Sequence, residues 1–173
     1  NHEHMMLEAL YYPIVVKKPW DNEDYVRQDK LKLWYYNGGD ITHYYLKHIR
    51  KAIRQEVFEF LSNLPLNIHV EVNGQKYLLI HGGVEANFEQ NNYKHDDKVT
   101  YAVWSRQSRH EVIPDDTILI FGHTPTNHFQ NDEPLKLWKN ENYIGIDCGC
   151  GYDSPGRLCC LRLDDMQDFY SDQ

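Results

Sequence analysis

The chain has 173 residues, with 26 Asp or Glu against 18 Lys or Arg and a formal net charge of −8. This acidic balance argues against general nucleic-acid binding, which needs clustered basic side chains to neutralise phosphates. Hydrophobic residues make up 41% of the chain, which excludes a disordered protein. No apolar run approaches the roughly 18 residues of a membrane-spanning helix, and residues 1–4 are polar, unlike a secretory signal. We therefore expect a cytoplasmic globular protein with neither membrane nor nucleic-acid partners.

The first third of the chain has a mainly helical pattern. Apolar residues at helical spacing predict a short helix over residues 3–12. Residues 13–32 are irregular and predict an extended loop or a loosely helical insert. A turn is expected at residues 37–39 (Asn-Gly-Gly), because glycine adopts positive φ without steric cost.

The longest helix is expected to start at Asp40 or Thr42 and to run to about residue 63. Its apolar face is formed by residues at spacings of three and four, namely Tyr45, Leu46, Ile49, Ile53, Val57, Phe60 and Leu61. Basic residues lie mainly off that face, namely His43, Lys47, His48, Arg50, Lys51 and Arg54. They indicate either a solvated flank or a surface that attracts an anionic substrate.

The pattern then changes to the alternation of a β-strand. Residues 68–72 alternate in polarity and are followed by Asn73-Gly74, which predicts a hairpin with a type I′ turn. Continuous apolar runs at residues 77–80, 117–121 and 143–146 are typical of fully buried strands.

The C-terminal residues carry one further strand pattern and the four cysteines. A final strand is expected over residues 158–163, and the acidic tail after Asp164 is expected to be solvated. The cysteines lie close together in the sequence, and their spacing does not match paired zinc knuckles. We interpret them as reduced structural thiols, namely Cys148, Cys150, Cys159 and Cys160.

Each of the three buried strands ends next to a polar residue and a glycine. These polar residues are His81, His123 and Asp147. In open α/β sheets, active sites collect at the carboxyl ends of the central strands, so the two histidines are candidate metal ligands. Asp147 either orients a neighbouring histidine or loop or simply caps a turn.

An ordered set of motifs resembles a known enzyme superfamily. Residues 1–3 (Asn-His-Glu), 81–83 (His-Gly-Gly) and 122–125 (Gly-His-Thr-Pro) are similar to the later motifs of the calcineurin-like metallophosphoesterases. Residues 34–39 and 104–106 also resemble its branch of bacterial and phage serine/threonine-type protein phosphatases and diadenosine-polyphosphatase relatives. The resemblance implies an α/β fold, the C-terminal part of a four-layer α/β/β/α sandwich. That single domain would span residues 1–173, with residues 11–63 as a largely helical cap.

The resemblance also assigns roles to individual residues. It implies that Asn1, His81 and His123 bind the second of two metals, and that His2 protonates the leaving group as general acid. Arg106 would clamp the substrate phosphate, for which its planar guanidinium is well suited. An alternative for Arg106 is a surface arginine that stacks on Trp104.

The expected cofactors are two divalent transition metals. One Asn oxygen and two imidazoles suit Mn above all, with Fe, Zn or Ni as alternatives. Two metals activate a water and stabilise the attacking and leaving oxygens of a phosphoryl displacement.

Two upstream family motifs, Asp-x-His and Gly-Asp-x-x-Asp-Arg-Gly, have no counterpart in the sequence. We therefore expect the chain to be the C-terminal portion of a longer phosphatase, and the 173 residues alone to be inactive or nearly so. A degenerate phosphatase that acts as a binding module is the non-catalytic alternative.

The expected substrate is a phosphoprotein or a small phosphorylated molecule. A serine/threonine phosphoprotein is favoured, with a diadenosine polyphosphate as the alternative. Aromatic residues of the insert form either a cap packed on the core or a groove for substrate, namely Tyr11, Tyr12, Trp20, Trp34, Tyr35 and Tyr36.

Overall fold

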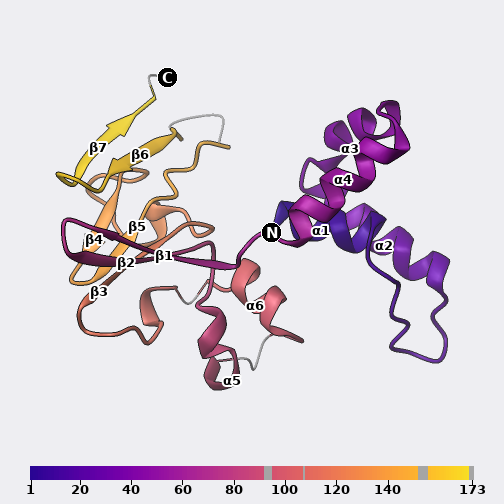
Figure 1. Ribbon diagram of the computed structural model, residues 1–173, viewed down its shortest axis with the longest axis horizontal. Helices are drawn as coiled ribbons and strands as arrows, with labels where there is room; N and C mark the ends of the chain where they lie inside the picture. Colours follow the sequence, from indigo (N-terminus) through magenta and orange to yellow (C-terminus); the bar gives the residue numbers. More distant parts are fainter. Residues whose placement is uncertain (92–94, 107, 152–155, 172–173) are drawn as a thin grey trace. The chain divides into compact units, whose positions relative to one another are not determined.

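The computed structural model describes residues 1–91, 95–106, 108–151 and 156–171. The chain divides into two units, residues 1–64 and residues 65–173 (Figure 1). The first unit contains the predicted helical insert, residues 11–63, together with residues 1–10. A bilayer-spanning helix is absent from the described part of the chain.

The first unit consists of helices. They are α1 (His2–Leu10), α2 (Glu23–Tyr36), α3 (Gly39–His48) and α4 (Lys51–Ser62). Each helix buries apolar side chains in the unit, namely Met5, Met6 and Leu7 from α1, Trp34 from α2, Leu46 from α3 and Phe58 from α4. The helix predicted over residues 3–12 is thus confirmed as α1, and the predicted turn follows α2, with Gly38 at φ 84°.

The predicted irregular segment 13–32 is only partly irregular, because its second half belongs to α2. This helix has a proper start: the Asn22 side chain accepts a hydrogen bond from the Tyr25 amide at 2.8 Å. Glu23 and Asp24 occupy its first turn, where carboxylates interact favourably with the helix dipole. Only Trp34 of α2 is buried. Because so few positions of this helix need to be apolar, its sequence has little amphipathic periodicity, and a regular helix was not predicted.

The single long helix predicted from residue 40 to 63 is wrong, because the structure has two helices in its place. Between α3 and α4 the backbone of Ile49 is extended and that of Arg50, with ψ 142°, is also non-helical. The break lets Leu46 and Phe58 both be buried; in one continuous helix, residues twelve apart would point about 120° away from each other. The predicted face is also partly wrong, since Phe60 is 66% exposed.

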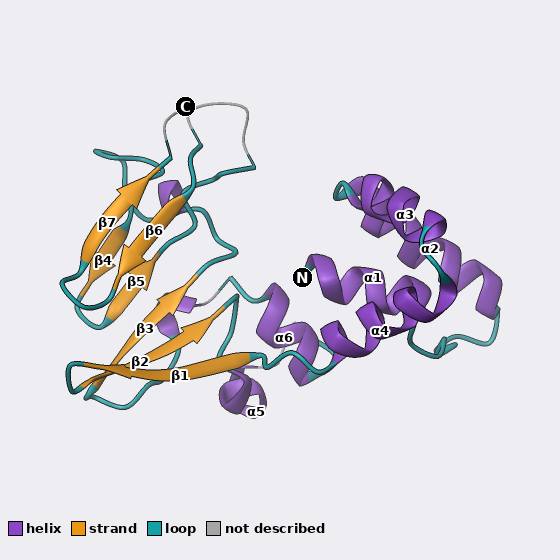
Figure 2. Ribbon diagram, turned by 45° about the horizontal axis from the view of Figure 1, so that its top comes forward, coloured by secondary structure: helices purple, strands orange, loops and turns teal. Residues whose placement is uncertain are grey.

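The second unit is built on a five-stranded mixed sheet with strand order β1-β2-β3-β5-β4 (Figure 2). The strands are β1 (Asn67–Val72), β2 (Gln75–Ile80), β3 (Thr117–Phe121), β4 (Trp138–Asn140) and β5 (Tyr143–Gly145). β2, β3 and β5 are parallel at the centre, whereas β1 and β4 are antiparallel edges. The hairpin prediction is confirmed, with positive φ at Asn73 and Gly74 as a type I′ turn requires.

Both faces of this sheet are covered. On one face Tyr77, Ile120 and Ile144 pack against Leu161 and Met166 of a hairpin formed by β6 (Cys159–Arg162) and β7 (Gln167–Tyr170). The opposite face buries a second cluster, namely Leu78, Ile80, Val84, Leu119 and Phe121. Burial on both faces explains the continuous apolar runs of β2 and β3.

The remaining elements of the second unit are short helices. They are α5 (Phe88–Asn91), α6 (Lys98–Trp104) and single 3₁₀ turns at Glu85–Asn87, Ser108–His110 and Thr126–His128. Figure 1 shows α5 and α6 on the side of the sheet away from the β6–β7 hairpin. The predicted α/β class is therefore confirmed. The expected final strand appears as β6, and part of the tail after Asp164 forms β7, in which all residues but Tyr170 are exposed, as expected for a solvated tail.

Candidate functional site

Two histidines meet at the carboxyl ends of neighbouring parallel strands. Ile80 pairs with Phe121 at the ends of β2 and β3, and the chain leaves both strands toward the same edge of the sheet. The imidazole ring centroids of His81 and His123 lie 4.8 Å apart. The Gly122 amide donates a hydrogen bond to the His81 carbonyl at 3.1 Å, so the backbone also connects the two segments.

The His81 segment lies directly on helix α6. The amides of Gly82 and Gly83 both donate to the carbonyl of Ala102 at 2.9 Å. A Cβ on Gly82 would lie 2.7 Å from the Ser105 carbonyl oxygen, which is closer than side-chain carbons approach. Glycine is therefore required here by close backbone approach, and this contact fixes the backbone at His81.

His123 is held in an uncommon conformation at the end of β3. Its φ is +62°, in the left-handed region that non-glycine residues rarely adopt. The Thr124 amide donates to the Gly122 carbonyl at 2.6 Å, and the Trp104 ring contacts the imidazole edge to face with centroids 5.8 Å apart. These contacts stabilise a strained residue, and such strain is typical of functional sites.

The electrostatics keep the His123 imidazole neutral. Burial, followed by the nearby His81 and Arg106, lowers its pKa to about 3. Its Nε2 is buried and has no hydrogen-bond partner among the described residues, and the Nε2 of His81 is buried as well. A neutral imidazole with an available ring nitrogen is the form that binds a metal.

Arg106 lies next to this pair. Its Nη1 donates to the His123 carbonyl at 3.0 Å, while the side chain remains exposed. The structure therefore anchors one end of the guanidinium at the candidate site.

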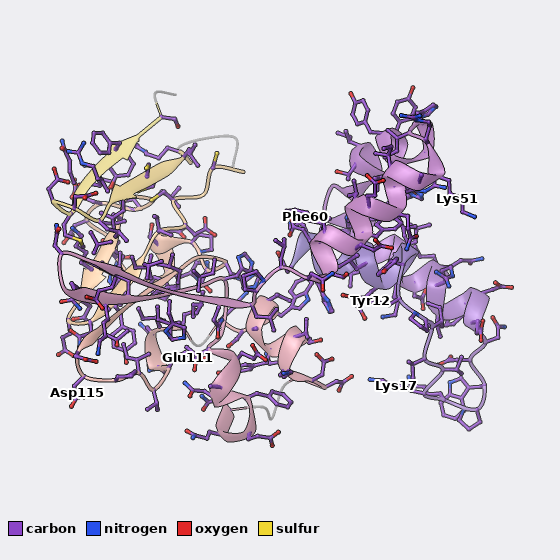
Figure 3. All side chains as sticks on the ribbon, viewed as in Figure 1. Tyr12, Lys17, Lys51, Phe60, Glu111 and Asp115 are labelled. Atoms are coloured by element: carbon purple, nitrogen blue, oxygen red, sulfur yellow. The ribbon has the colours of Figure 1, made fainter. Side chains whose placement is uncertain are left out.

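A buried carboxylate that the sequence did not predict, Glu111, connects elements of the second unit next to the site. Glu111 is 1% exposed and accepts hydrogen bonds from the Tyr101 hydroxyl and, at 2.7 Å, from Asn87 Nδ2. The Tyr143 hydroxyl donates to the Glu111 carbonyl at 2.8 Å. Tyr101 belongs to α6 and Tyr143 to β5, so this network connects the helix that contacts Gly82 to the sheet; Glu111 is labelled in Figure 3. No local sequence pattern around Glu111 reveals partners that are distant in the chain.

Asn1 and His2 belong to the first unit. The Asn1 carbonyl accepts a hydrogen bond from the Met5 amide at 2.9 Å at the start of α1. His2 is exposed and lines a pocket of about 190 Å³ with Glu3, Trp34 and Leu46. The structure thus brings together His81, His123 and Arg106 in the second unit. Asn1 and His2 lie in the first unit.

Asp147 caps a turn, and the cysteines differ in burial, from the buried Cys148 to the exposed Cys150 and Cys160. The Asp147 carboxylate accepts a hydrogen bond from the Gly149 amide at 3.0 Å, which is the turn-capping alternative. All four cysteines are free thiols, as predicted. Burial raises the pKa of the Cys148 thiol to about 12, so this thiol is protonated and unreactive at neutral pH.

The described residues offer two nitrogen donors to a metal at this site, His81 and His123. Among the described residues, no three His, Cys, Asp or Glu side chains are grouped so that they could hold a metal ion. The pair His81 and His123 does fit as two adjacent nitrogen donors, because both Nε2 atoms are buried and His123 is neutral.

The comparisons with known proteins add no family. No known protein-family model matches this chain, and no curated protein is significantly similar to it.

Proposed function

We propose that this protein is a metal-dependent phosphoesterase that hydrolyses phosphomonoesters, with serine/threonine phosphoproteins as its substrates. The observation that carries the proposal is the pair of imidazoles, His81 and His123, 4.8 Å apart at the ends of β2 and β3. His123 is strained and neutral, and the Nε2 atoms of both histidines are buried; such strain is typical of functional sites, and this edge of an α/β sheet is where they collect. We also propose a cytoplasmic location, which the four free thiols support.

In this proposal His81 and His123 hold a divalent transition metal, for which Mn is the first candidate. The motif resemblance adds Asn1 as a further ligand and a second metal in the complete site. Bound metals of this kind supply a water of lowered pKa and charge stabilisation for a phosphoryl displacement.

The other residues act on the substrate. The Arg106 guanidinium, anchored through Nη1 to the His123 carbonyl, has further N–H groups with which to bind the oxygens of a phosphate. His2 is proposed to donate a proton to the leaving-group oxygen, so that no free alkoxide is expelled.

Metal binding is the first experiment, because it needs no complete catalytic site. Purified chain is titrated with Mn²⁺ and with Co²⁺, and binding is followed by calorimetry and by the visible absorption of Co²⁺. We expect His81→Ala and His123→Ala each to weaken binding at least about tenfold, as the loss of one ligand does. His69→Ala, an exposed histidine of β1, is the matched control and should bind normally.

Activity is then measured on the intact gene product with a phosphoserine peptide and with diadenosine tetraphosphate. We expect Mn²⁺-dependent hydrolysis of the phosphopeptide, which His2→Ala slows mainly in kcat and Arg106→Ala mainly in KM. Metal binding without any phosphatase activity would refute the enzymatic proposal in favour of a binding module. Equal metal affinity of His81→Ala and the unchanged protein would refute the metal site itself.

A further inference from the structure

Helix α3 exposes an apolar stripe to solvent. Ile41, Tyr44, Tyr45 and His48, which we call the α3 stripe, occur at spacings of three and four and so share one helix face. Ile41, Tyr44 and Tyr45 are 65%, 61% and 65% exposed. On a typical surface helix such a stripe faces the core, but in α3 the buried side chain is Leu46.

The aromatic side chains of the stripe are ordered by contacts with one another. The Tyr44 and His48 rings lie 4.4 Å apart, and the Tyr44 and Tyr45 rings pack edge to face at 5.7 Å. The His48 Nδ1 also lies 2.6 Å from the Tyr44 carbonyl oxygen. Because these rings are already ordered, a partner that packs on them loses little additional side-chain entropy.

Basic residues border the stripe without acidic neighbours in the sequence. Between Asp40 and Glu56 the chain carries Lys47, Arg50 and Lys51 as exposed cations, and no Asp or Glu. None of these three forms an ion pair within the part of the chain that the structure describes. Figure 3 shows Lys51 projecting from the start of α4. A partner that complements the charge of these three residues is therefore negatively charged.

We propose that the α3 stripe and its basic border form a docking surface for an acidic protein segment. Apolar side chains of the segment pack on Tyr44 and Tyr45, and its carboxylates pair with Lys47, Arg50 and Lys51. Exposed contiguous apolar residues with a charged rim are typical of protein-interaction sites. A nucleic acid would stack its bases on aromatic rings. Because Ile41 is aliphatic and offers no ring for stacking, the surface favours a peptide. The inference is independent of the phosphoesterase proposal, since it uses no residue of that site.

The test measures binding of a fluorescein-labelled amphipathic helical peptide whose polar face is Glu, by fluorescence anisotropy with the full 173-residue chain. The matched probe has Lys in place of Glu. We expect the Glu peptide to bind, with affinity that falls as salt is added, and the Lys peptide to bind at least about tenfold more weakly.

Two variants test the two halves of the surface. Tyr44→Ala/Tyr45→Ala removes the apolar contact, and Lys47→Glu/Lys51→Glu reverses the charge. Each double variant should bind the Glu peptide about tenfold more weakly or worse. Phe60→Ala and Lys18→Glu, at exposed positions of the same unit, are the matched controls and should bind normally. Circular dichroism checks that the helices of each variant are intact.

Several results would overturn the proposal. They are equal binding of the Glu and Lys peptides, unchanged affinity of both double variants, or tighter binding of oligouridine or phosphatidylserine vesicles than of the Glu peptide. Self-association of the chain that Tyr44→Ala/Tyr45→Ala abolishes, without peptide binding, would instead assign the surface to a second copy.

Discussion

The contact between Gly82 and helix α6 predicts a specific cost for one added methyl group. In Gly82→Ala the new Cβ would lie 2.7 Å from the Ser105 carbonyl oxygen and 3.1 Å from the Ala102 carbonyl oxygen. Both neighbours are backbone atoms, so neither can rotate away as a side chain would. Gly82 is not in a left-handed conformation, so the effect tests space alone and not backbone strain.

The magnitude follows from the structure. Ordinary contact begins near 3.4 Å, so the segment must move by about 0.7 Å, which strains packing by about 1–3 kcal/mol. The same movement weakens the two amide bonds to the Ala102 carbonyl, each worth about 1 kcal/mol net. We therefore expect the free energy of unfolding of the second unit to fall by about 3 kcal/mol, a large part of a typical domain's stability.

Hydrogen exchange of peptides from β2 and β3, followed by mass spectrometry, reports the stability of the second unit separately from the first. Gly151→Ala is the matched control, because no atom of the described residues lies within 4 Å of its Cβ, and it should change stability by less than about 0.5 kcal/mol. If Gly82→Ala matched this control, the packing of the His81 segment on α6 would be wrong. We also expect Gly82→Ala to weaken metal binding, since it moves His81.

Two further predictions concern buried groups of the second unit. Tyr101→Phe should lower the free energy of unfolding by about 2 kcal/mol, because it removes the hydrogen bond to the buried Glu111 carboxylate. Burial and this hydrogen bond raise the pKa of Tyr101 above 10, so its stabilising contribution is complete below pH 10 and is lost as the pH rises through the raised value. Urea titrations of both proteins at pH 8 and pH 11 should therefore show a difference that shrinks at the higher pH, and a constant difference would contradict this. For the thiols, Ellman's reagent at pH 8 should modify the exposed Cys150 and Cys160 quickly and the buried Cys148 only on unfolding; fast modification of Cys148 would contradict its burial.

Local sequence signals predicted the parts of the fold that local physics determines. Asn73-Gly74 predicted its turn because both positions need positive φ, and the apolar runs of β2 and β3 predicted burial on both faces. The approach of His81 and His123 was also predictable, since parallel strands end at the same edge of a sheet.

The features of the fold that the sequence did not predict depend on contacts between residues distant in the chain. The α3–α4 break at Ile49 involves neither glycine nor proline, and only packing shows it. Glu111 looks like an ordinary surface carboxylate until Asn87 and Tyr101 are placed around it. Strand β7 lies in an acidic tail and is stabilised by pairing with β6, which no local pattern indicates.

The parallel pairing of β2 with β3 has a consequence for the order of folding. The β1–β2 hairpin closes through a two-residue turn, which takes microseconds in typical hairpins. Ile80 and Phe121 are 41 positions apart in the sequence, so their pairing must first overcome the entropy of closing a long loop. We expect the two histidines to become neighbours only in the late steps of folding, so that a metal added to the unfolded chain accelerates none of the early ones.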